Sequence, residues 1–306
     1  MNGPVVECVP NFSEGRDVRR VEAIVAAMRV EGVRLLDWSM DADHNRSVVT
    51  IAGDPAAVVE SAVRGVGKAA ELIDLTRQEG AHPRIGAADV IPFVPISGIK
   101  LEQCVLLARQ AGLEIWRRYG VPVYFYEAAA ARPDRVNLEE VRRGQFEGLR
   151  GAVHKEASRR PDLGGPGLHP TAGACAVGAR KFLVSYNLYF DSTDVAMVRA
   201  IAREIRAASG GLKGVKALGV LAHGRAQLSM NITDFEATPV SLVYSAVSRL
   251  ALRHKTAPVE GEIIGLVPDA ACERESEWMR QLTGFDLQTK VLEHRLAAPL
   301  AWPGEV

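Results

Sequence analysis

The chain has 306 residues, of which 47% are hydrophobic and 24% charged, and its 37 Lys and Arg residues balance its 37 Asp and Glu residues. This composition predicts a globular protein with a buried core, long enough for two domains. The zero net charge argues against nucleic acid or a membrane surface as a partner, because either would favour a basic excess.

The cysteines are typical of free thiols. Cys8, Cys104, Cys175 and Cys272 lie far apart and form no CxxC pair, which argues against a disulfide framework and against a zinc site. The N-terminal residues lack the basic-then-apolar layout of a signal peptide, and no apolar run is as long as a membrane span. We therefore expect a cytoplasmic protein without a bound metal.

Hydrophobic periodicity and turn signals predict the elements of the first half. Asp54 followed by Pro55 is typical of a helix N-terminus, and Gly120 follows the end of a helical pattern. In chain order we predict a strand at 5–12, a helix at 16–30, strands at 33–40 and 47–52, a helix at 54–72, a strand at 88–96, a helix at 101–119 and a strand at 121–127.

The second half repeats this order. We predict a strand at 182–190, a helix at 194–207, strands at 215–221 and 227–232 joined at His223-Gly224, a helix capped by Thr238 with Pro239 at its first position, and a strand at 262–267. Both halves read strand–helix–strand–strand–helix–strand, the split βαβ order. The predicted fold is an α+β (α/β) sandwich of two ferredoxin-like subdomains, residues 1–180 and 181–306, each a mixed sheet with helices packed on one face.

A segment rich in Gly and Pro, residues 159–180, lies between the two halves. It contains neither a P-loop nor a dinucleotide fingerprint, so nucleotide binding is not supported. It also lacks the composition of a disordered tether. Because ligand pockets often form between domains, a ligand-contacting loop is favoured over a plain linker.

The polar stretch DADHN, from Asp41 to Asn45, resembles the first half of a calcium loop. Calcium binding is excluded because the required glycine and glutamate positions hold Arg46 and Ala52. A hairpin turn pinned by Asp and Asn side chains is the favoured interpretation. A polar substrate contact by His44, Asn45 or Arg46 is the alternative.

The sequence GAHPRIGAADVIPF, from Gly80 to Phe93, holds the strongest candidate for a catalytic group. Pro83 stiffens the backbone after His82, and Gly80 and Gly86 let the loop bend. An imidazole on such a loop is either an acid–base catalyst or a structural residue. No nucleophile elbow is present, so covalent catalysis is unsupported.

Taken together, these segments resemble the glutamate formimidoyltransferases, the family that includes the formiminotransferase part of formiminotransferase–cyclodeaminase. The resemblance covers about the whole chain and follows the order of the family's motifs. Its segments are ECVPNFSEG (7–15), NRSVVTIAGDP (45–55), GAHPRIGAADVIPF (80–93), VPVYFYEAA (121–129), GARKFLVSYNL (178–188), QLSMNITDFEATP (227–239) and IIGLVP (263–268).

The resemblance implies an activity. The formimidoyl group of N-formimidoyl-L-glutamate would pass to N5 of tetrahydrofolate, a step of histidine degradation and one-carbon metabolism, in a homodimer with a folate tunnel between the subdomains. The family's catalytic histidine maps to His82. Its folate-contacting loop maps to Leu163, Gly164, Gly165, Pro166, Gly167, Leu168, His169, Pro170, Thr171, Ala172 and Gly173. A carboxylate of the mammalian relatives is replaced by Ser39, and Asp41 or Asp43 is the candidate substitute.

Further binding residues follow from the chemistry of the two substrates. Their N–H groups call for acceptors, for which Glu7, Asn11, Asp37 and Asp41 are candidates. Their carboxylates call for guanidinium groups, for which Arg46, Arg84 and Arg180 are candidates.

Two other functions are weighed against this one. One is a folate-dependent formyltransferase acting on 5-formyltetrahydrofolate or N-formylglutamate, which the sequence does not separate from the first. The other is an RNA-binding or interaction module, which the zero net charge and the 6% aromatic content disfavour.

Overall fold

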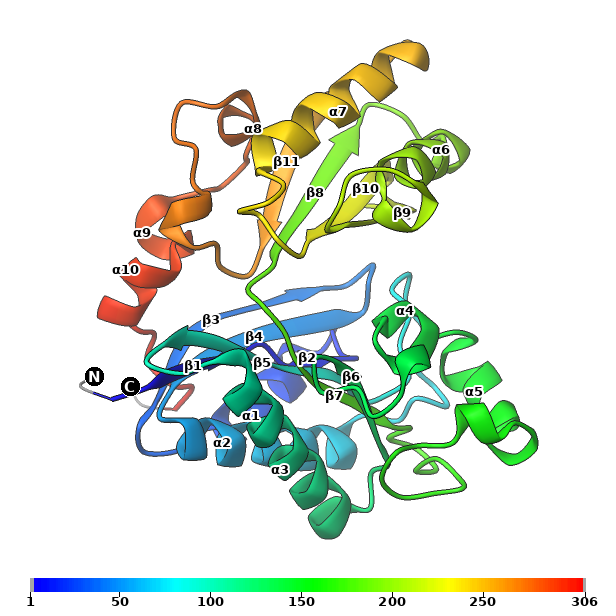
Figure 1. The fold of residues 1–306 in the computed structure, drawn as a ribbon, viewed down its shortest axis with the longest axis vertical. Coiled ribbons are helices and arrows are strands. Elements are labelled where there is room, and N and C mark those ends of the chain that lie inside the picture. The colour runs from blue at the N-terminus through cyan, green and yellow to red at the C-terminus, as the bar shows by residue number, and fades with distance from the viewer. Residues whose placement is uncertain (1–2, 305–306) are drawn as a thin grey trace. The chain divides into compact units, whose positions relative to one another are not determined.

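The computed structural model describes residues 3–304, so the ends of the predicted domains at 1–2 and 305–306 lie outside the described residues. The described residues divide into two compact units (Figure 1), residues 3–180 with 299–304, and residues 181–298. The prediction placed 299–306 with the second half, whereas residues 299–304 lie with the first unit, where the Leu300 N–H donates to the Leu35 carbonyl. Within 3–304 no helix has the length and apolar character needed to cross a membrane.

The first unit is built on one sheet, with neighbours in the order β3-β4-β1/β2-β5-β7-β6. The order of the first four positions, with antiparallel pairing throughout, is that of a ferredoxin-like sheet, and β7 and β6 extend it in parallel. The strands are β1 (Val5–Cys8), β2 (Asn11–Phe12), β3 (Val33–Asp41), β4 (Arg46–Gly53), β5 (Ala88–Ser97), β6 (Val123–Glu127) and β7 (Cys175–Ala179).

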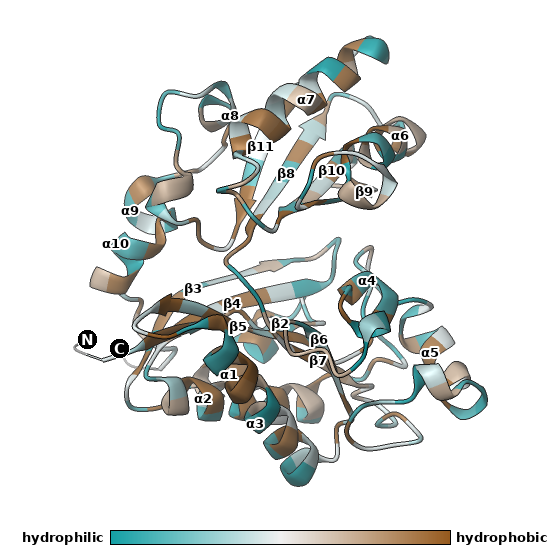
Figure 2. Ribbon diagram, viewed as in Figure 1, coloured by the Kyte–Doolittle hydropathy of each residue, from teal (hydrophilic) through white to brown (hydrophobic). Residues whose placement is uncertain are grey.

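Helices α1, α2 and α3 cover one face of this sheet (Figure 1). Apolar residues of the strands and of these helices form the core between the two layers (Figure 2). The helices of this unit are α1 (Val18–Ala27), α2 (Pro55–Leu72), α3 (Leu101–Tyr119), α4 (Leu138–Val141) and α5 (Gln145–Lys155). At the β5-β7-β6 end, alternate strand residues such as Tyr124 and Tyr126 form a second core with Val141 and Leu149 on the opposite face. Helices were predicted on one face of the sheet only, whereas α4 and α5 form a smaller layer on the other face at this end.

Local caps explain where the helices begin and end. Asp54 accepts from the backbone N–H groups of Ala56 and Ala57, and Gly120 ends α3 with φ of 63°, as predicted. α1 begins two residues later than predicted, because the carboxylate of Asp17 caps it. Short 3-10 helices occupy Pro133–Arg135, Ala157–Arg159, Ala207–Ser209 and Asp269–Ala271.

The second unit is a four-stranded sheet in the order β11-β8-β10-β9, the ferredoxin-like order with every pair antiparallel. The mixed character that we predicted for both sheets is thus confined to the first. Helices α6 and α7 contribute to its core. Its elements are β8 (Val184–Phe190), α6 (Val195–Ile205), β9 (Val215–Ala222), β10 (Arg225–Ile232), α7 (Val240–Arg253), β11 (Pro258–Ile264), α8 (Glu277–Arg280), α9 (Leu287–Lys290) and α10 (Leu292–Ala297).

The hairpin at His223-Gly224 is confirmed, since both residues have positive φ, as a tight turn between two strands requires. The cap of α7 was predicted wrongly. Thr238 uses its hydroxyl to donate to the Lys213 carbonyl, and Pro239 stands at the N-cap position. The last strand was predicted at 262–267, whereas β11 spans residues 258–264, the segment that pairs with β8.

Strand β7 lies inside the Gly-rich segment, where no strand was predicted. Its residues are small and buried on both faces, so they show no alternation of apolar and polar positions. The segment forms a strand because it pairs with β5 on one side and β6 on the other, and the local sequence carries no signal for these partners.

The loop before β5 pairs closely with the residues before β7. The Ala174 N–H donates to the Ile85 carbonyl, and the Ala87 N–H donates to the Ala172 carbonyl, both at 2.9 Å. This approach leaves no space for a side chain, since a Cβ on Gly86 would lie 2.0 Å from the Ala174 oxygen. The histidine loop and the Gly-rich segment are therefore held together by backbone.

Replacing Gly86 with alanine should destabilise the first unit by about 1–3 kcal/mol or more, because backbone would have to move. Gly148 in α5 is the matched control, since nothing lies within 4 Å of its added Cβ. Gly148→Ala should stabilise the protein by roughly 0.5–1 kcal/mol, as Ala does in exposed helices. Urea unfolding of both variants checks this, and equal midpoints would contradict the close contact at Gly86.

Candidate active site

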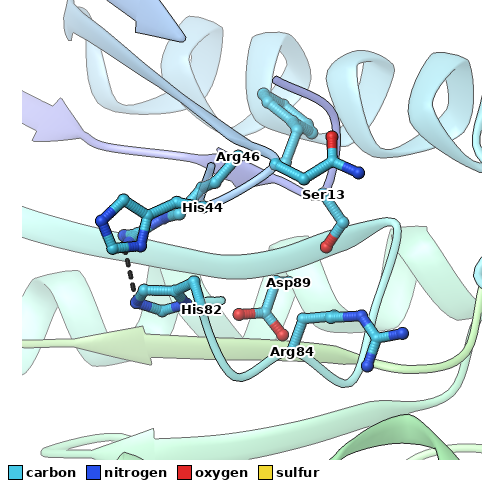
Figure 3. Close-up of a pocket in the computed structure, with 8 residues that line it drawn as sticks. Ser13, His44, Arg46, His82, Arg84 and Asp89 are labelled. Atoms are coloured by element: carbon cyan, nitrogen blue, oxygen red, sulfur yellow. Dashed lines mark hydrogen bonds between the residues drawn. The ribbon is translucent and has the colours of Figure 1, made fainter. Parts of the chain in front are cut away.

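A small pocket, open to solvent, lies at the end of the first sheet where β4 and β5 begin. Figure 3 shows His82 between the segment of His44 and Arg46 on one side and Asp89 on the other. The residues that line it are Phe12, Ser13, His44, Asn45, Arg46, His82, Arg84 and Asp89.

His82 makes two hydrogen bonds that fix its tautomer. Its Nδ1 lies 2.8 Å from the Pro83 carbonyl oxygen, and its Nε2 lies 2.7 Å from Nη1 of Arg46 (Figure 3). A carbonyl only accepts and a guanidinium only donates. Nδ1 therefore carries the proton, and Nε2 presents its lone pair.

The surroundings of His82 favour this neutral form. Burial is the largest cause that lowers its pKa well below the ordinary value, followed by the positive charges of Arg46 and Arg142. The bond to the Pro83 carbonyl acts in the opposite direction, and His44, whose ring centroid lies 6.1 Å away, adds a small lowering effect. At neutral pH the ring is an uncharged base.

Arg46, at the start of β4, is half-buried beside this base. Burial, and next the charge of Arg142, lower its pKa to about 10, so it stays charged at neutral pH. The carboxylates of Asp89 and Asp41 act against this lowering. Its Nε is buried and has no hydrogen-bond partner within residues 3–304.

The DADHN stretch forms the hairpin turn between β3 and β4, as the favoured interpretation predicted. Asp41 accepts from the His44 N–H. Asn45 accepts from the Gly15 N–H and donates to the Glu79 carbonyl. The Ala81 N–H donates to the Asp43 carbonyl, so this turn is tied directly to the loop that carries His82.

Asp89 and Arg142 are site residues that the sequence reasoning missed. Asp89 accepts from the Ile85 N–H at 2.7 Å and pairs with Arg142, which follows α4. A carboxylate within the apolar run of β5 was a usable signal, because such groups are rarely buried without a partner. Arg142 gave no such signal among the arginines around it.

Arg84 was predicted to bind a substrate carboxylate, but protein acceptors occupy its guanidinium. Nε donates to Gln78, and the two Nη atoms bond Glu147 at 3.0 and 2.7 Å. Further bonds go to Gln145 and to the Gln78 carbonyl. Figure 3 shows the side chain extending away from His82. These contacts give Arg84 a structural role in joining the loop to α5.

The other predicted binding residues do not line the pocket. Asn11, in β2, donates to the Val9 carbonyl, and Asp37 is buried within β3. Glu7 and Arg180 lie near Cys8, whose pKa is raised first by burial and then by Glu7, while Arg180 lowers it. Asp41 acts on the site through Arg46, because its carboxylate opposes the lowering of the pKa of that guanidinium.

The predicted folate loop, 163–173, is ordered by its own backbone and by α3. His169 and Gly173 exchange backbone hydrogen bonds, and the Ala172 N–H donates to Nδ1 of His169 at 3.0 Å. Gly164, with φ of 74°, packs against the ring of Trp116. The paired backbones around Gly86 place this loop beside the loop of His82. Within residues 3–304 no group of three or more His, Cys, Asp or Glu side chains is arranged to hold a metal ion.

Comparison with known proteins gives a consistent set of relatives. Residues 5–180 match the family described as the formiminotransferase domain, N-terminal subdomain, and residues 185–296 match the formiminotransferase domain. A glutamate formimidoyltransferase of Streptococcus pyogenes serotype M1 is 42% identical over 95% of this chain and 98% of its own length. One of Thermoplasma acidophilum is 44% identical over 95% and 97%. A formimidoyltransferase-cyclodeaminase of Dictyostelium discoideum is 37% identical over 96% of this chain but 56% of its own length.

The lowered pKa of His82 predicts a dependence of stability on pH. Because the unfolded chain binds a proton at His82 near pH 6.5 and the folded chain resists it, this contribution is present above pH ~6.5 and is lost as the pH falls. The free energy of unfolding of the wild type, minus that of His82→Asn, should therefore decrease by up to about 1.4 kcal/mol per pH unit below pH ~6.5. Urea unfolding between pH 7.5 and pH 5 measures it. A difference that is constant with pH would show that His82 titrates normally.

Proposed function

The chain belongs to the formiminotransferase family, and on that premise we propose that its pocket performs the reaction of a glutamate formimidoyltransferase. The protein transfers the formimidoyl group from N-formimidoyl-L-glutamate to N5 of tetrahydrofolate and releases L-glutamate. The observation that carries the assignment is a neutral imidazole at the position of the family's catalytic histidine. Its Nδ1 donates to the Pro83 carbonyl, so Nε2 carries the lone pair that can take up a proton. The formyltransferase alternative is not favoured, because the relatives matched over nearly their full length are formimidoyltransferases.

Proton movement is the difficult part of this reaction. The donor is an amidine that is protonated near neutral pH and already electrophilic. N5 attacks its carbon and forms a tetrahedral adduct, in which N5 still holds a proton. The glutamate nitrogen must gain a proton before its bond to that carbon breaks. A single group that accepts the first proton and delivers the second serves both steps.

His82 suits this role in its observed tautomer. The Nε2 lone pair takes the proton from N5 and returns it to the glutamate nitrogen, after which the carbon–nitrogen bond breaks and glutamate leaves as the amine. During the interval the ring is positively charged, and its Nδ1–H bond to the Pro83 carbonyl strengthens. Proton transfer of this kind contributes about 10² to 10⁴ in rate. Holding both substrates in attack geometry supplies much of the rest.

Substrate contacts follow from what surrounds His82. Arg46 and Arg84 both line the pocket, and because protein acceptors engage Arg84, Arg46 is assigned to a carboxylate of the donor. The 163–173 loop, which is joined to the His82 loop by backbone, is assigned to tetrahydrofolate. Glu7, Asn11, Asp37, Asp41 and Arg180 stay predictions as binding residues. The homodimer and the cytoplasmic location also stay predictions.

Replacing His82 with asparagine tests the catalytic role. The asparagine Nδ2 can still donate to the Pro83 carbonyl, but no atom replaces Nε2. We expect kcat to fall by about 10² to 10⁴, with smaller changes in KM, because ground-state contacts remain. Release of L-glutamate from N-formimidoyl-L-glutamate and tetrahydrofolate is the assay. Turnover of the variant near the wild-type rate would remove His82 from the mechanism.

Replacing Arg84 with glutamine separates structure from binding. The loss of a guanidinium with five protein hydrogen bonds should lower the free energy of unfolding by about 2–3 kcal/mol. The KM for N-formimidoyl-L-glutamate, measured well below the unfolding temperature, should change little. If instead KM rises tenfold or more while stability is unchanged, Arg84 binds the donor and the structural assignment is wrong.

A further inference from the structure

The Nε2 lone pair of His82, the atom that must take up a proton, is already engaged. Arg46 Nη1 donates to it at 2.7 Å, and a neutral imidazole has only one lone pair to offer. A reacting N–H cannot bond to this nitrogen while the guanidinium does. The pocket as observed therefore holds its base in a capped form.

We propose that Arg46 caps the base in the free protein by donating to Nε2 of His82. When the donor binds, its α-carboxylate pairs with the Arg46 guanidinium and separates the guanidinium from the ring, so that the donor frees its own general base. This inference rests on the proposed function. It makes Arg46 a positioning residue for His82 in addition to a carboxylate contact.

A carboxylate competes well for this guanidinium. Hydrogen bonds between a guanidinium and a carboxylate join two charged groups and are about twice as strong as those between neutral groups. The present acceptor, His82 Nε2, is uncharged. The Nε of Arg46 is buried and has no partner within the described residues, so once the guanidinium leaves the ring, a second donor on the same planar group can join a two-pronged contact without breaking another hydrogen bond.

The connectivity of the donor selects its α-carboxylate. The nitrogen that leaves is bonded to Cα, which carries that carboxylate, so only two bonds separate the leaving nitrogen from the carboxylate carbon. When Nε2 of His82 stands at hydrogen-bond distance from the leaving nitrogen, the carboxylate is close enough to that nitrogen to reach the guanidinium that now contacts Nε2. The carbon of the γ-carboxylate is four bonds from the leaving nitrogen, and the glutamate tail of tetrahydrofolate is separated from N5 by the aminobenzoyl group.

Release of the cap also changes the basicity of the ring. The charged groups that face His82 are Arg46 from β4, Arg142 after α4 and His44 from the hairpin turn, and all three lower its pKa. Arg142 is paired with Asp89, whereas Arg46 is the one in contact with the ring. Burial, the largest cause of the lowered pKa, remains when the donor binds, but once a carboxylate neutralises Arg46 the next largest cause is removed, so the pKa of His82 rises and the ring becomes a better base.

A titration of His82 by NMR tests this without turnover. The ring C–H resonance, assigned by its loss in His82→Asn, is followed with pH in the free protein and with each of two ligands. N-acetyl-L-glutamate carries the α-carboxylate and no positive amine, and 4-acetamidobutyrate lacks only that carboxylate. We expect N-acetyl-L-glutamate to raise the pKa of His82 and saturating 4-acetamidobutyrate to leave it unchanged. An equal response to both ligands, or no response to N-acetyl-L-glutamate at saturation, would overturn the proposal.

Two variants and a control locate the effect in Arg46. In Arg46→Gln the free protein should already show the raised pKa of His82, and N-acetyl-L-glutamate should raise it no further. The KM for the donor should increase about 10- to 100-fold, the loss expected for hydrogen bonds between charged groups. Arg46→Lys, which keeps the charge, should recover the low pKa of the free protein.

Arg16→Gln is the matched control, because Arg16 donates to the Ala42 carbonyl of the same turn and is not among the groups that shift His82. It should behave as the wild type. If Arg46→Gln leaves the pKa of His82 low, or if the ligand raises that pKa in Arg46→Gln as in the wild type, Arg46 is not the cap. A protein that shows every pKa change but transfers no formimidoyl group would contradict the proposed function alone.

Discussion

The site depends on the two hydrogen bonds of the His82 ring. The Pro83 carbonyl decides which nitrogen carries the proton, and the Arg46 guanidinium holds the other nitrogen as a lone pair. Neither bond would have fixed geometry if the loops that carry these residues were free to move. The rest of the first unit keeps three loops in contact: the turn between β3 and β4, the loop of His82 and the 163–173 loop.

The sheet provides the first part of that constraint. Strand β2 pairs with both β4 and β5, and Phe12 is opposite Ser47 on one side and Ala88 on the other. Arg46 and Asp89, each next to one of these partners, are thereby brought to the same end of the sheet. Arg46 at the start of β4 and Asp89 near the start of β5 are thus separated by the single strand β2, and the loop of His82 leads into β5.

Close backbone contacts provide the second part. Gly80 lies against the His44 carbonyl, and Gly86 and Gly173 lie where the loop of His82 meets the Gly-rich loop. Positive φ at Gly173 is a conformation that other residues adopt only under strain. The electrostatic character of the pocket follows, since burial first, and then the two arginines brought beside the ring, lower the pKa of His82 and keep it neutral.

The sequence allowed much of this to be predicted where the signal is local. The N-cap at Asp54, the helix end at Gly120 and the turn at His223 each depend on neighbours within a few residues, and the structure confirms them. His82 could be selected because glycines and a proline surround it. The engagement of Arg84 by Glu147, the pair of Asp89 with Arg142 and the strand β7 could not be predicted, because each depends on residues distant in the chain. One sequence carries no signal for such partners.

Every step assigned to His82 requires a ring that is neutral and protonated on Nδ1. Long-range proton–nitrogen NMR of the free protein at pH 7, with His82→Asn for assignment, reads this directly, because the protonated and unprotonated ring nitrogens resonate far apart. The account predicts a protonated Nδ1 and an unprotonated Nε2. A ring protonated on Nε2, or on both nitrogens, would contradict it.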